Sequence, residues 1–224
     1  MSPRRVRLRA MAVSRPALLG LAGTLATLAV PSNASAAALL VGQKCARSGT
    51  PSFNMATSGW APGASLTIHL GSFGHTVTAD GSGVFSTAGA PLTAPVLSRP
   101  GVKTFSLTVT DGVTTAGPVR TKIVRRGVLV PDRAKPAQTV RYRGYGFPVH
   151  KRLYLHVRRG GKTKGTFRIG RPSGACGLVT RKLRYMPLRR WSTGTYDFWF
   201  SNTRTFRKSR TLYGYRINIY RRFG

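Results

Sequence analysis

Short runs of alternating apolar and polar residues recur along the chain, and this pattern constrains the fold more than any other feature. Examples are Ser65–Leu70 (SLTIHL), Thr104–Val109 (TFSLTV), Tyr196–Phe200 and Tyr215–Ile219. Successive side chains of a strand point to opposite faces, so such runs predict strands with one buried face. Gly, Pro, Ser and Asp clusters separate the runs, and no sustained helical periodicity is present. The sequence therefore predicts an all-β fold of the sandwich or barrel type.

Residues 1–36 carry the pattern of an export signal. Five arginines precede the apolar stretch Ala17–Val30, and the tripeptide at 34–36 (ASA) has the small-x-small form of a signal-peptidase site. The apolar stretch is short for a membrane span, which favours a cleaved signal over an uncleaved N-terminal anchor. The sequence thus predicts a secreted or cell-envelope protein with no transmembrane anchoring in its mature form.

A weak internal repeat with an offset of 87 residues organises the rest of the chain. Gly59-Trp60 corresponds to Gly146-Phe147, and Leu66–Leu70 corresponds to Leu153–Val157. The same order of features over about 90 residues predicts two similar domains. The predicted organisation is a signal peptide (1–36), a first β-sandwich (37–125), a linker (126–137) and a strongly basic second β-sandwich (138–224).

Three short motifs of the first half occur in an order typical of a known repeat family. Ser58–Leu66 (SGWAPGASL) holds a Gly-aromatic-x-Pro-Gly turn before a strand, Thr78–Ser86 (TADGSGVFS) holds a glycine-rich hairpin turn, and Pro100-Gly101 precedes an alternating run. Together they resemble the bacterial Ig-like repeats of secreted and surface proteins, over most of residues 45–124. The resemblance implies consecutive Ig-like antiparallel β-sandwiches that act as spacers or binding modules, although only Gly146-Phe147-Pro148 and the strand order remain in the second half. The family has no common catalytic residues.

The charge balance excludes several classes of function. The chain has 37 Lys+Arg and only 4 Asp+Glu, a formal net charge of +33, and none of the four acids is Glu. Enzymes built on paired carboxylates and carboxylate-rich metal sites are therefore excluded. Four scattered His and two Cys form no metal-binding pattern. We expect no enzyme activity, no cofactor and no metal.

The positive charge is concentrated in the second half of the chain. Residues 126–224 carry a net charge of +23 and all eight Tyr, whereas residues 37–125 carry +5. Alternation would gather the arginines on one continuous sheet face, whose self-repulsion favours a polyanionic partner. Arginine also pairs bidentately with phosphate and carboxylate. The competing explanation is codon bias together with a solubilising surface.

The expected partner is an anionic surface polymer, such as a cell-wall polymer or an acidic polysaccharide. The alternative is sequence-independent nucleic-acid binding through phosphates only. The sequence does not indicate the oligomeric state. The candidate polyanion-binding residues are Arg158, Arg159, Lys162, Lys164, Arg181, Lys182, Arg184, Arg189, Arg190, Arg207, Lys208 and Arg210.

Cys45 and Cys176 are the only cysteines, and an even number in an exported protein favours a disulfide. Two buried thiols, or pairing between molecules, are the alternatives at this stage. A catalytic Cys176 lacks a neighbouring His or Asn in the sequence. His69 and His156 hold equivalent places in the repeat, and the alternation predicts that both face away from the core as surface residues.

Overall fold

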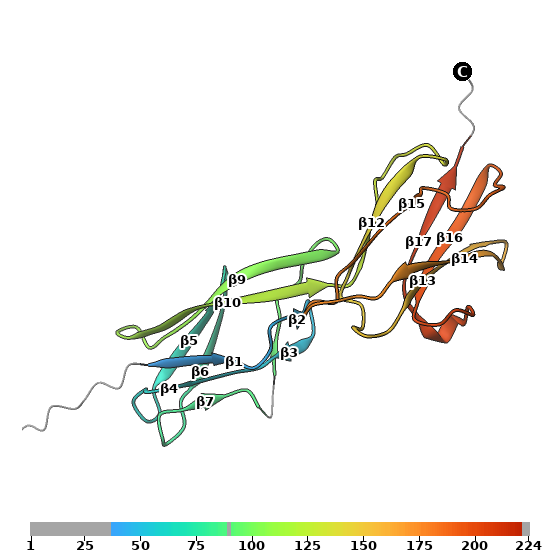
Figure 1. Cartoon of the computed structure of the whole chain (residues 1–224). Helices are drawn as coiled ribbons and strands as arrows, with labels where there is room; N and C mark the ends of the chain where they lie inside the picture. Colours follow the sequence, from blue (N-terminus) through green and yellow to red (C-terminus); the bar gives the residue numbers. More distant parts are fainter. Residues whose placement is uncertain (1–36, 89–90, 221–224) are drawn as a thin grey trace, which may run out of the picture. The chain divides into compact units, whose positions relative to one another are not determined.

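The computed structural model describes residues 37–88 and 91–220, and in these residues the chain is all-β. The predicted signal peptide at 1–36 lies outside the described residues. One short 3₁₀ turn, η1 (Lys208–Arg210), is the only helical element in the described part. No helix there is long and apolar enough to span a membrane. The strands form two groups of sheets (Figure 1), and each group surrounds its own hydrophobic core.

Two sheets enclose the first core, which includes Leu66, Leu107 and Val109, all buried. Neighbouring strands are antiparallel, except that β2 and β10 run parallel. The three-stranded sheet has the order β1 (Ala38–Val41), β4 (Met55–Ser58), β7 (Phe85–Ser86). The five-stranded sheet has the order β2 (Ala46–Arg47), β10 (Thr115–Arg125), β9 (Gly101–Thr110), β5 (Ser65–Leu70), β6 (Phe73–Thr78), and β3 (Pro51–Phe53) pairs separately with β8 (Leu92–Thr93).

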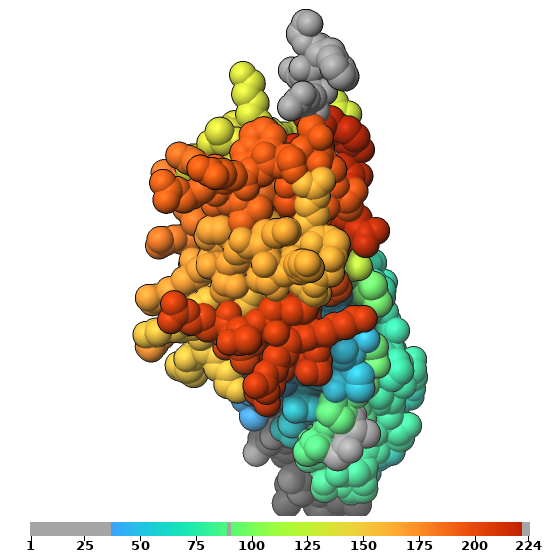
Figure 2. All heavy atoms as spheres, turned by 90° about the vertical axis from the view of Figure 1, so that its right-hand side faces the viewer, coloured from blue at the N-terminus to red at the C-terminus, as the bar shows by residue number. Residues whose placement is uncertain are grey.

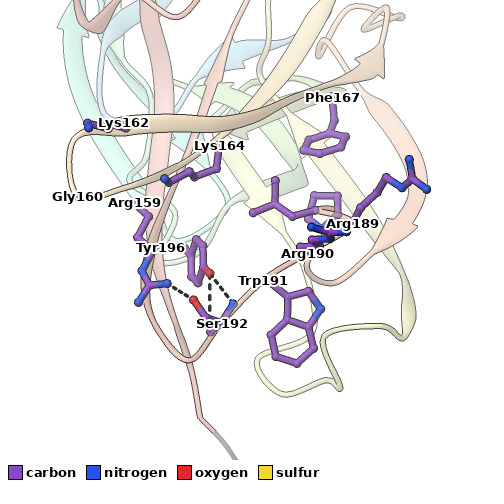
Figure 3. A pocket seen from close by; sticks show the side chains of 12 residues that line it. Arg159, Gly160, Lys162, Lys164, Phe167, Arg189, Arg190, Trp191, Ser192 and Tyr196 are labelled. Atoms are coloured by element: carbon purple, nitrogen blue, oxygen red, sulfur yellow. Dashed lines mark hydrogen bonds between the residues drawn. The ribbon is translucent and has the colours of Figure 1, made fainter.

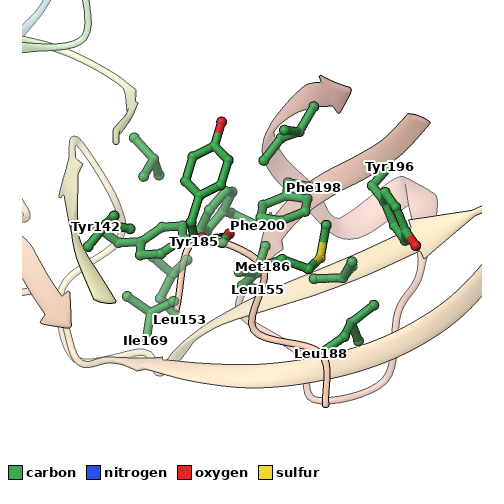
Figure 4. Packing of buried hydrophobic residues seen from close by; sticks show 14 of the residues in the cluster. Tyr142, Leu153, Leu155, Ile169, Tyr185, Met186, Leu188, Tyr196, Phe198 and Phe200 are labelled. Atoms are coloured by element: carbon green, nitrogen blue, oxygen red, sulfur yellow. Dashed lines mark hydrogen bonds between the residues drawn. The ribbon is translucent and has the colours of Figure 1, made fainter. Parts of the chain in front are cut away.

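Two further sheets enclose the second core, where the rings and aliphatic side chains of Tyr142, Leu155, Phe198 and Phe200 meet (Figure 4). These four side chains have no exposed surface. The first sheet has the order β11 (Gly127–Leu129), β12 (Thr139–Tyr145), β15 (Val179–Arg184). The second has the order β14 (Lys162–Gly170), β13 (Leu153–Arg159), β16 (Gly194–Ser201), β17 (Thr211–Ile219).

The internal repeat of the sequence is a repeat of strand order. The order β10-β9-β5-β6 in the first half recurs as β17-β16-β13-β14 in the second, and β1-β4-β7 recurs as β11-β12-β15. The division of the chain into two domains that fold independently stays a prediction. Strand β11 lies within the predicted linker and pairs with β12, so the second set of sheets begins earlier than expected. Three residues are too few to show alternation, and neighbouring glycine and proline residues hid this strand.

An equivalent backbone hydrogen bond to a glycine holds one aromatic residue in place in each half. The amide of Trp60 donates to the carbonyl oxygen of Gly83 at 3.2 Å, and the amide of Phe147 donates to that of Gly177, also at 3.2 Å. Both glycines have positive φ, +73° and +57°. A Cβ on either glycine would overlap the carbonyl oxygen of the aromatic residue. Glycine is therefore required at both positions, and Trp60 and Phe147 are held in the cores.

A disulfide bond joins Cys45 to Cys176. Their Cα atoms are 5.4 Å apart, and 131 residues separate them in the sequence. Cys45 immediately precedes β2, and Cys176 lies buried in the turn before β15. The bond covalently links the residue just before β2 in the first half to the turn before β15 in the second half. A sulfur held in this bond is not a nucleophile, so the structure offers no support for a catalytic Cys176.

Replacement of Gly177 by alanine should destabilise the protein by about 2–4 kcal/mol, because the new Cβ meets a backbone oxygen in a left-handed conformation. Gly174 is the matched control, since its φ is also positive at +66° but no atom lies within 4 Å of its Cβ position. Gly174→Ala should cost only about 1–2 kcal/mol. Urea denaturation of both variants measures the difference in the free energy of unfolding. Equal losses would contradict the requirement for glycine at position 177.

Removal of the disulfide in Cys45→Ser/Cys176→Ser should lower the free energy of unfolding by about 5 kcal/mol if the chain unfolds in one transition. The chain-entropy model gives this value for a closed loop as long as the 131 residues between the cysteines. Guanidinium denaturation with and without the bond measures the change. A loss below about 1 kcal/mol would show that the bond barely restricts the unfolded chain.

Candidate functional site

A basic groove lies in the second half, between the β13–β14 hairpin and the segment that leads from β15 to β16 (Figure 3). It has a volume of about 1310 Å³. Cationic and aromatic side chains dominate its walls. The residues that line it are Arg159, Gly160, Lys162, Lys164, Phe167, Pro187, Leu188, Arg189, Arg190, Trp191, Ser192 and Tyr196.

The hairpin forms the first wall of the groove. Its turn residues Gly160 and Gly161 have φ values of +52° and +76°, as a two-residue type I′ turn requires. A Gly-Gly pair between two β-like runs of the sequence predicts a hairpin at this place, and the pairing of Arg159 with Lys162 confirms it. The turn leads into β14, the edge strand of its sheet, from which the exposed side chains of Lys162 and Lys164 line the groove. The lysines are thus carried by a regular strand and not by an irregular loop.

The segment after β15 forms the second wall. Leu188 is buried in the core and anchors the segment, while Arg189 and Arg190 remain exposed. The indole of Trp191 is 42% exposed, which leaves a large part of an apolar ring in contact with water. The amide of Ser192 donates to the Tyr196 hydroxyl at 3.0 Å, and that hydroxyl donates to the Ser192 carbonyl oxygen at 3.1 Å. These bonds fix the segment to the start of β16.

Arg159 connects the two walls. Its guanidinium group donates to the Ser192 hydroxyl and, at 2.9 Å, to the carbonyl oxygen of Thr193. The same group lies 5.3 Å from the ring centroid of Tyr196. Three contacts to the opposite wall make Arg159 a positioning residue of the groove, which leaves the lysines and the other two arginines of the groove as its free cations.

No carboxylate neutralises these cations. No acidic residue lines the groove, and the single ion pair of the described residues joins Arg216 to Asp197 at 2.9 Å on neighbouring strands. The described residues also contain no cluster of three or more His, Cys, Asp or Glu side chains that could hold a metal ion. The arrangement is suited to binding anions through exposed guanidinium and ammonium groups.

The structure brings five of the twelve candidate residues together in the groove and places the others elsewhere. Arg181 lines a separate hollow with Arg171. The expectation of one continuous basic face is therefore wrong, because the candidate residues come from strands of two sheets and from loops. Lys182 and Arg184 lie on β15, Arg207 precedes η1, Lys208 and Arg210 lie in η1, and Arg158 lies on β13.

His156 faces away from the core, as predicted, but it is not a surface residue. The connection between β16 and β17 lies on the surface of the second half (Figure 2), where Phe206 packs on His156 of β13 and on Trp199 of β16, and His156 is completely buried. The ring of Phe206 contacts the imidazole edge-on at 5.5 Å and lies 4.1 Å beneath the guanidinium carbon of Arg158. Sequence alternation identifies the face of a strand correctly, but it carries no information about a distant segment that covers that face.

The buried imidazole is fully hydrogen-bonded. Its Nε2 lies 3.1 Å from the carbonyl oxygen of Thr203 and 2.8 Å from the Ser201 hydroxyl, and its Nδ1 lies 3.0 Å from the Thr166 hydroxyl. A carbonyl oxygen only accepts, so Nε2 carries the proton and Nδ1 accepts from Thr166. Burial lowers the pKa of His156 and the nearby charge of Arg158 lowers it too, against the opposing effect of the hydrogen bond to the Thr203 carbonyl oxygen, and the net direction is downward. The residue is therefore a neutral structural histidine.

The candidate residues identified from the sequence do not include the aromatic and apolar members of the groove, such as Phe167 and Trp191. One signal was available, because Pro187-Leu188 corresponds to Pro91-Leu92 in the repeat. At this equivalent place the first half also has a hollow, of about 390 Å³, beside β5 and β6. Apolar side chains such as Phe73 dominate its walls, and it contains no lysine or arginine. The repeat therefore places a hollow at the same position in both halves, with different chemistry.

No family model matches the chain, and no curated protein sequence is similar to it. Among solved structures, the chain is similar to a tetra-tandem repeat in the extending region of a large adhesion protein, with 17% identity over 74% of this chain and 44% of that one and a TM-score of 0.29. A Ca²⁺-stabilized adhesin that helps an Antarctic bacterium bind ice matches with 14% identity over 82% and 48%, and a TM-score of 0.33. Fibronectin(III)-like modules of Clostridium thermocellum CbhA match with 10% identity over 73% and 84%, and a TM-score of 0.25. The chain spans less than half the length of the two adhesin structures.

The stability of the protein should fall as the pH falls below about 6.5, because the unfolded chain then binds a proton at His156 that the folded chain does not. This residue contributes a slope of at most about 1.4 kcal/mol per pH unit. Urea denaturation at several pH values between about 5 and 7.5 measures the slope. His156→Gln should flatten it. Equal slopes for wild type and His156→Gln would contradict this assignment.

Proposed function

We propose that the chain is a non-enzymatic binding protein of the bacterial exterior or cell envelope, and that its basic groove binds an acidic polymer. The proposed location rests on the export pattern of residues 1–36. The observation that carries the binding proposal is the groove itself, where five cationic side chains gather without a carboxylate among them. The first half, with its much lower charge, acts as a spacer or a second interaction module.

The groove suits a chain-like anion better than a small one. It is a wide, open channel, and its cations are distributed over both walls, so a ligand has to reach several of them to use the site fully. Arg189 and Arg190 provide planar forks that pair with carboxylate, sulfate or phosphate groups, while Lys162 and Lys164 act as mobile point charges. Trp191 adds an exposed ring on which an apolar face of the ligand can stack.

A cell-wall polymer or an acidic polysaccharide is the proposed ligand class. An exported protein meets such polymers outside the cytoplasm. It is also separated from the genome, so a role in gene regulation does not fit this location. Nucleic acid offers the same phosphate chemistry without sequence recognition, and the binding experiment treats it as a separate outcome. In both cases, binding should weaken steeply as salt is added. Binding releases counterions from the polymer, and this release is less favourable at a higher salt concentration.

Binding of residues 37–224 should be measured for purified cell wall, heparin, double-stranded DNA and neutral dextran, between about 50 and 500 mM NaCl. We expect binding to the acidic polysaccharide and the cell wall, a steep loss with salt, and none to dextran. The variant K162Q/K164Q/R189Q/R190Q keeps Arg159 and should bind about tenfold more weakly. Exposed charge contacts are worth about 0.2–1 kcal/mol each, and about 1.4 kcal/mol is tenfold.

The variant K44Q/R99Q/R120Q/K122Q is the matched control, because it removes the same number of exposed charges from the first half. It should bind within about threefold of wild type, since only long-range screened charge is lost. Equal losses in the two variants would show that net charge, and not the groove, causes binding. Tighter binding to DNA than to either envelope ligand would replace the proposed ligand with nucleic acid.

A further inference from the structure

A second group of cations lies outside the groove, on the outer face of the β11-β12-β15 sheet. Arg141 and Arg143 of β12 are exposed, and Tyr142 between them points into the core. Lys182 and Arg184 of β15 are exposed on the neighbouring strand. We call these four side chains the β12–β15 face. Only the two from β15 were identified from the sequence.

The pairing of the two strands places like charges next to each other. Arg141 lies directly opposite Lys182 in the antiparallel register, Arg143 lies opposite Thr180, and Arg184 lies opposite Thr139. Residues two apart on one strand are about 7 Å apart and opposite residues are closer, so Arg141 and Lys182 lie within about one Debye length of each other at physiological salt, and Arg143 and Arg184 lie one such step further along the face in opposite directions. Directly opposed like charges destabilise a sheet.

No ion pair among the described residues relieves this repulsion. None of the four side chains takes part in the ion pair found in the described residues, which is Asp197 with Arg216. None makes a side-chain hydrogen bond to a carbonyl group, unlike Arg126 and Arg159, which each donate to a backbone oxygen. A bound anion would remove the repulsion and gain several charge-assisted hydrogen bonds at once.

The β12–β15 face and the groove point in different directions. Side chains on the face stand perpendicular to their sheet and away from the core, whereas the groove opens along the edge strand β14 and the segment after β15. The two groups of cations therefore occupy different parts of the second half, each wide enough to contact its own polymer segment. The two surfaces differ in shape as well, because one is a channel with aromatic walls and the other is a pleated sheet surface.

We propose that the β12–β15 face is a second anion-binding surface, and that one molecule uses it together with the groove to join two strands of acidic polymer. This inference rests on the proposed function of the groove. The second half would then cross-link two polymer chains, and would not bind along one polymer chain only. Joined strands gain avidity because the second contact forms within an existing complex.

Energy transfer between labelled polymer chains tests the proposal. Short heparin chains that carry either a donor or an acceptor dye are mixed with residues 37–224, and heparin binding is measured in parallel by anisotropy. Wild type should bind heparin and produce energy transfer. The face variant R141Q/R143Q/K182Q/R184Q should still bind through its groove, but its energy transfer should fall by about tenfold.

The groove variant K162Q/K164Q/R189Q/R190Q should lose energy transfer to a similar extent, whereas the control K44Q/R99Q/R120Q/K122Q should keep it within about twofold of wild type. Circular dichroism confirms that each variant is folded. Energy transfer by the face variant at the wild-type level would overturn the proposal, and so would binding by wild type without transfer. In both cases the function proposed for the groove stands as long as wild type binds heparin more tightly than the groove variant does, which the anisotropy measurement shows separately.

Discussion

Repulsion among cationic side chains is the constraint on which the structure of the second half depends. Residues 126–224 carry a net charge of +23, and the described residues contain a single ion pair. Carboxylates therefore cannot hold this half together. Its stability has to come from apolar burial, and the core supplies it with large rings such as Tyr142, Phe198 and Phe200, none of which retains exposed surface. The cations are confined to edges, loops and outer faces, where water and salt weaken their repulsion.

The two halves show how one strand order supports two kinds of surface. Both place a hollow beside the hairpin of the equivalent strands, β5–β6 in one half and β13–β14 in the other. In the first half its walls are apolar and carry no lysine or arginine, and in the second they are cationic. The shared turn that fixes Trp60 and Phe147 belongs to the scaffold and not to the hollow. The fold can therefore keep its buried geometry while the chemistry of one edge changes.

Features that depend on neighbouring residues could be predicted from the sequence, and features that depend on distant segments could not. Alternation gave the all-β fold, and Gly160-Gly161 gave the hairpin turn. The partner of Cys45 stayed open, because pairing depends on the distance between residues 131 positions apart. The covering of His156 by the β16–β17 connection was missed for the same reason. The groove combines a hairpin with a segment about 30 residues later, so composition could identify its cations but not which of them lie together.

Aromatic rings take the place that carboxylates usually hold around partly buried arginines in this protein. Arg158 lies over the ring of Phe206 and Arg159 lies over that of Tyr196. A ring attracts the guanidinium through its quadrupole but does not neutralise the charge, so the positive potential extends outward to a partner. A carboxylate at either position would hold the arginine equally well and cancel its field. The rings therefore hold these arginines in a chain that has almost no acidic residues. Arg159 connects the two walls of the groove, and the groove keeps a positive surface toward the solvent, as the proposed function requires.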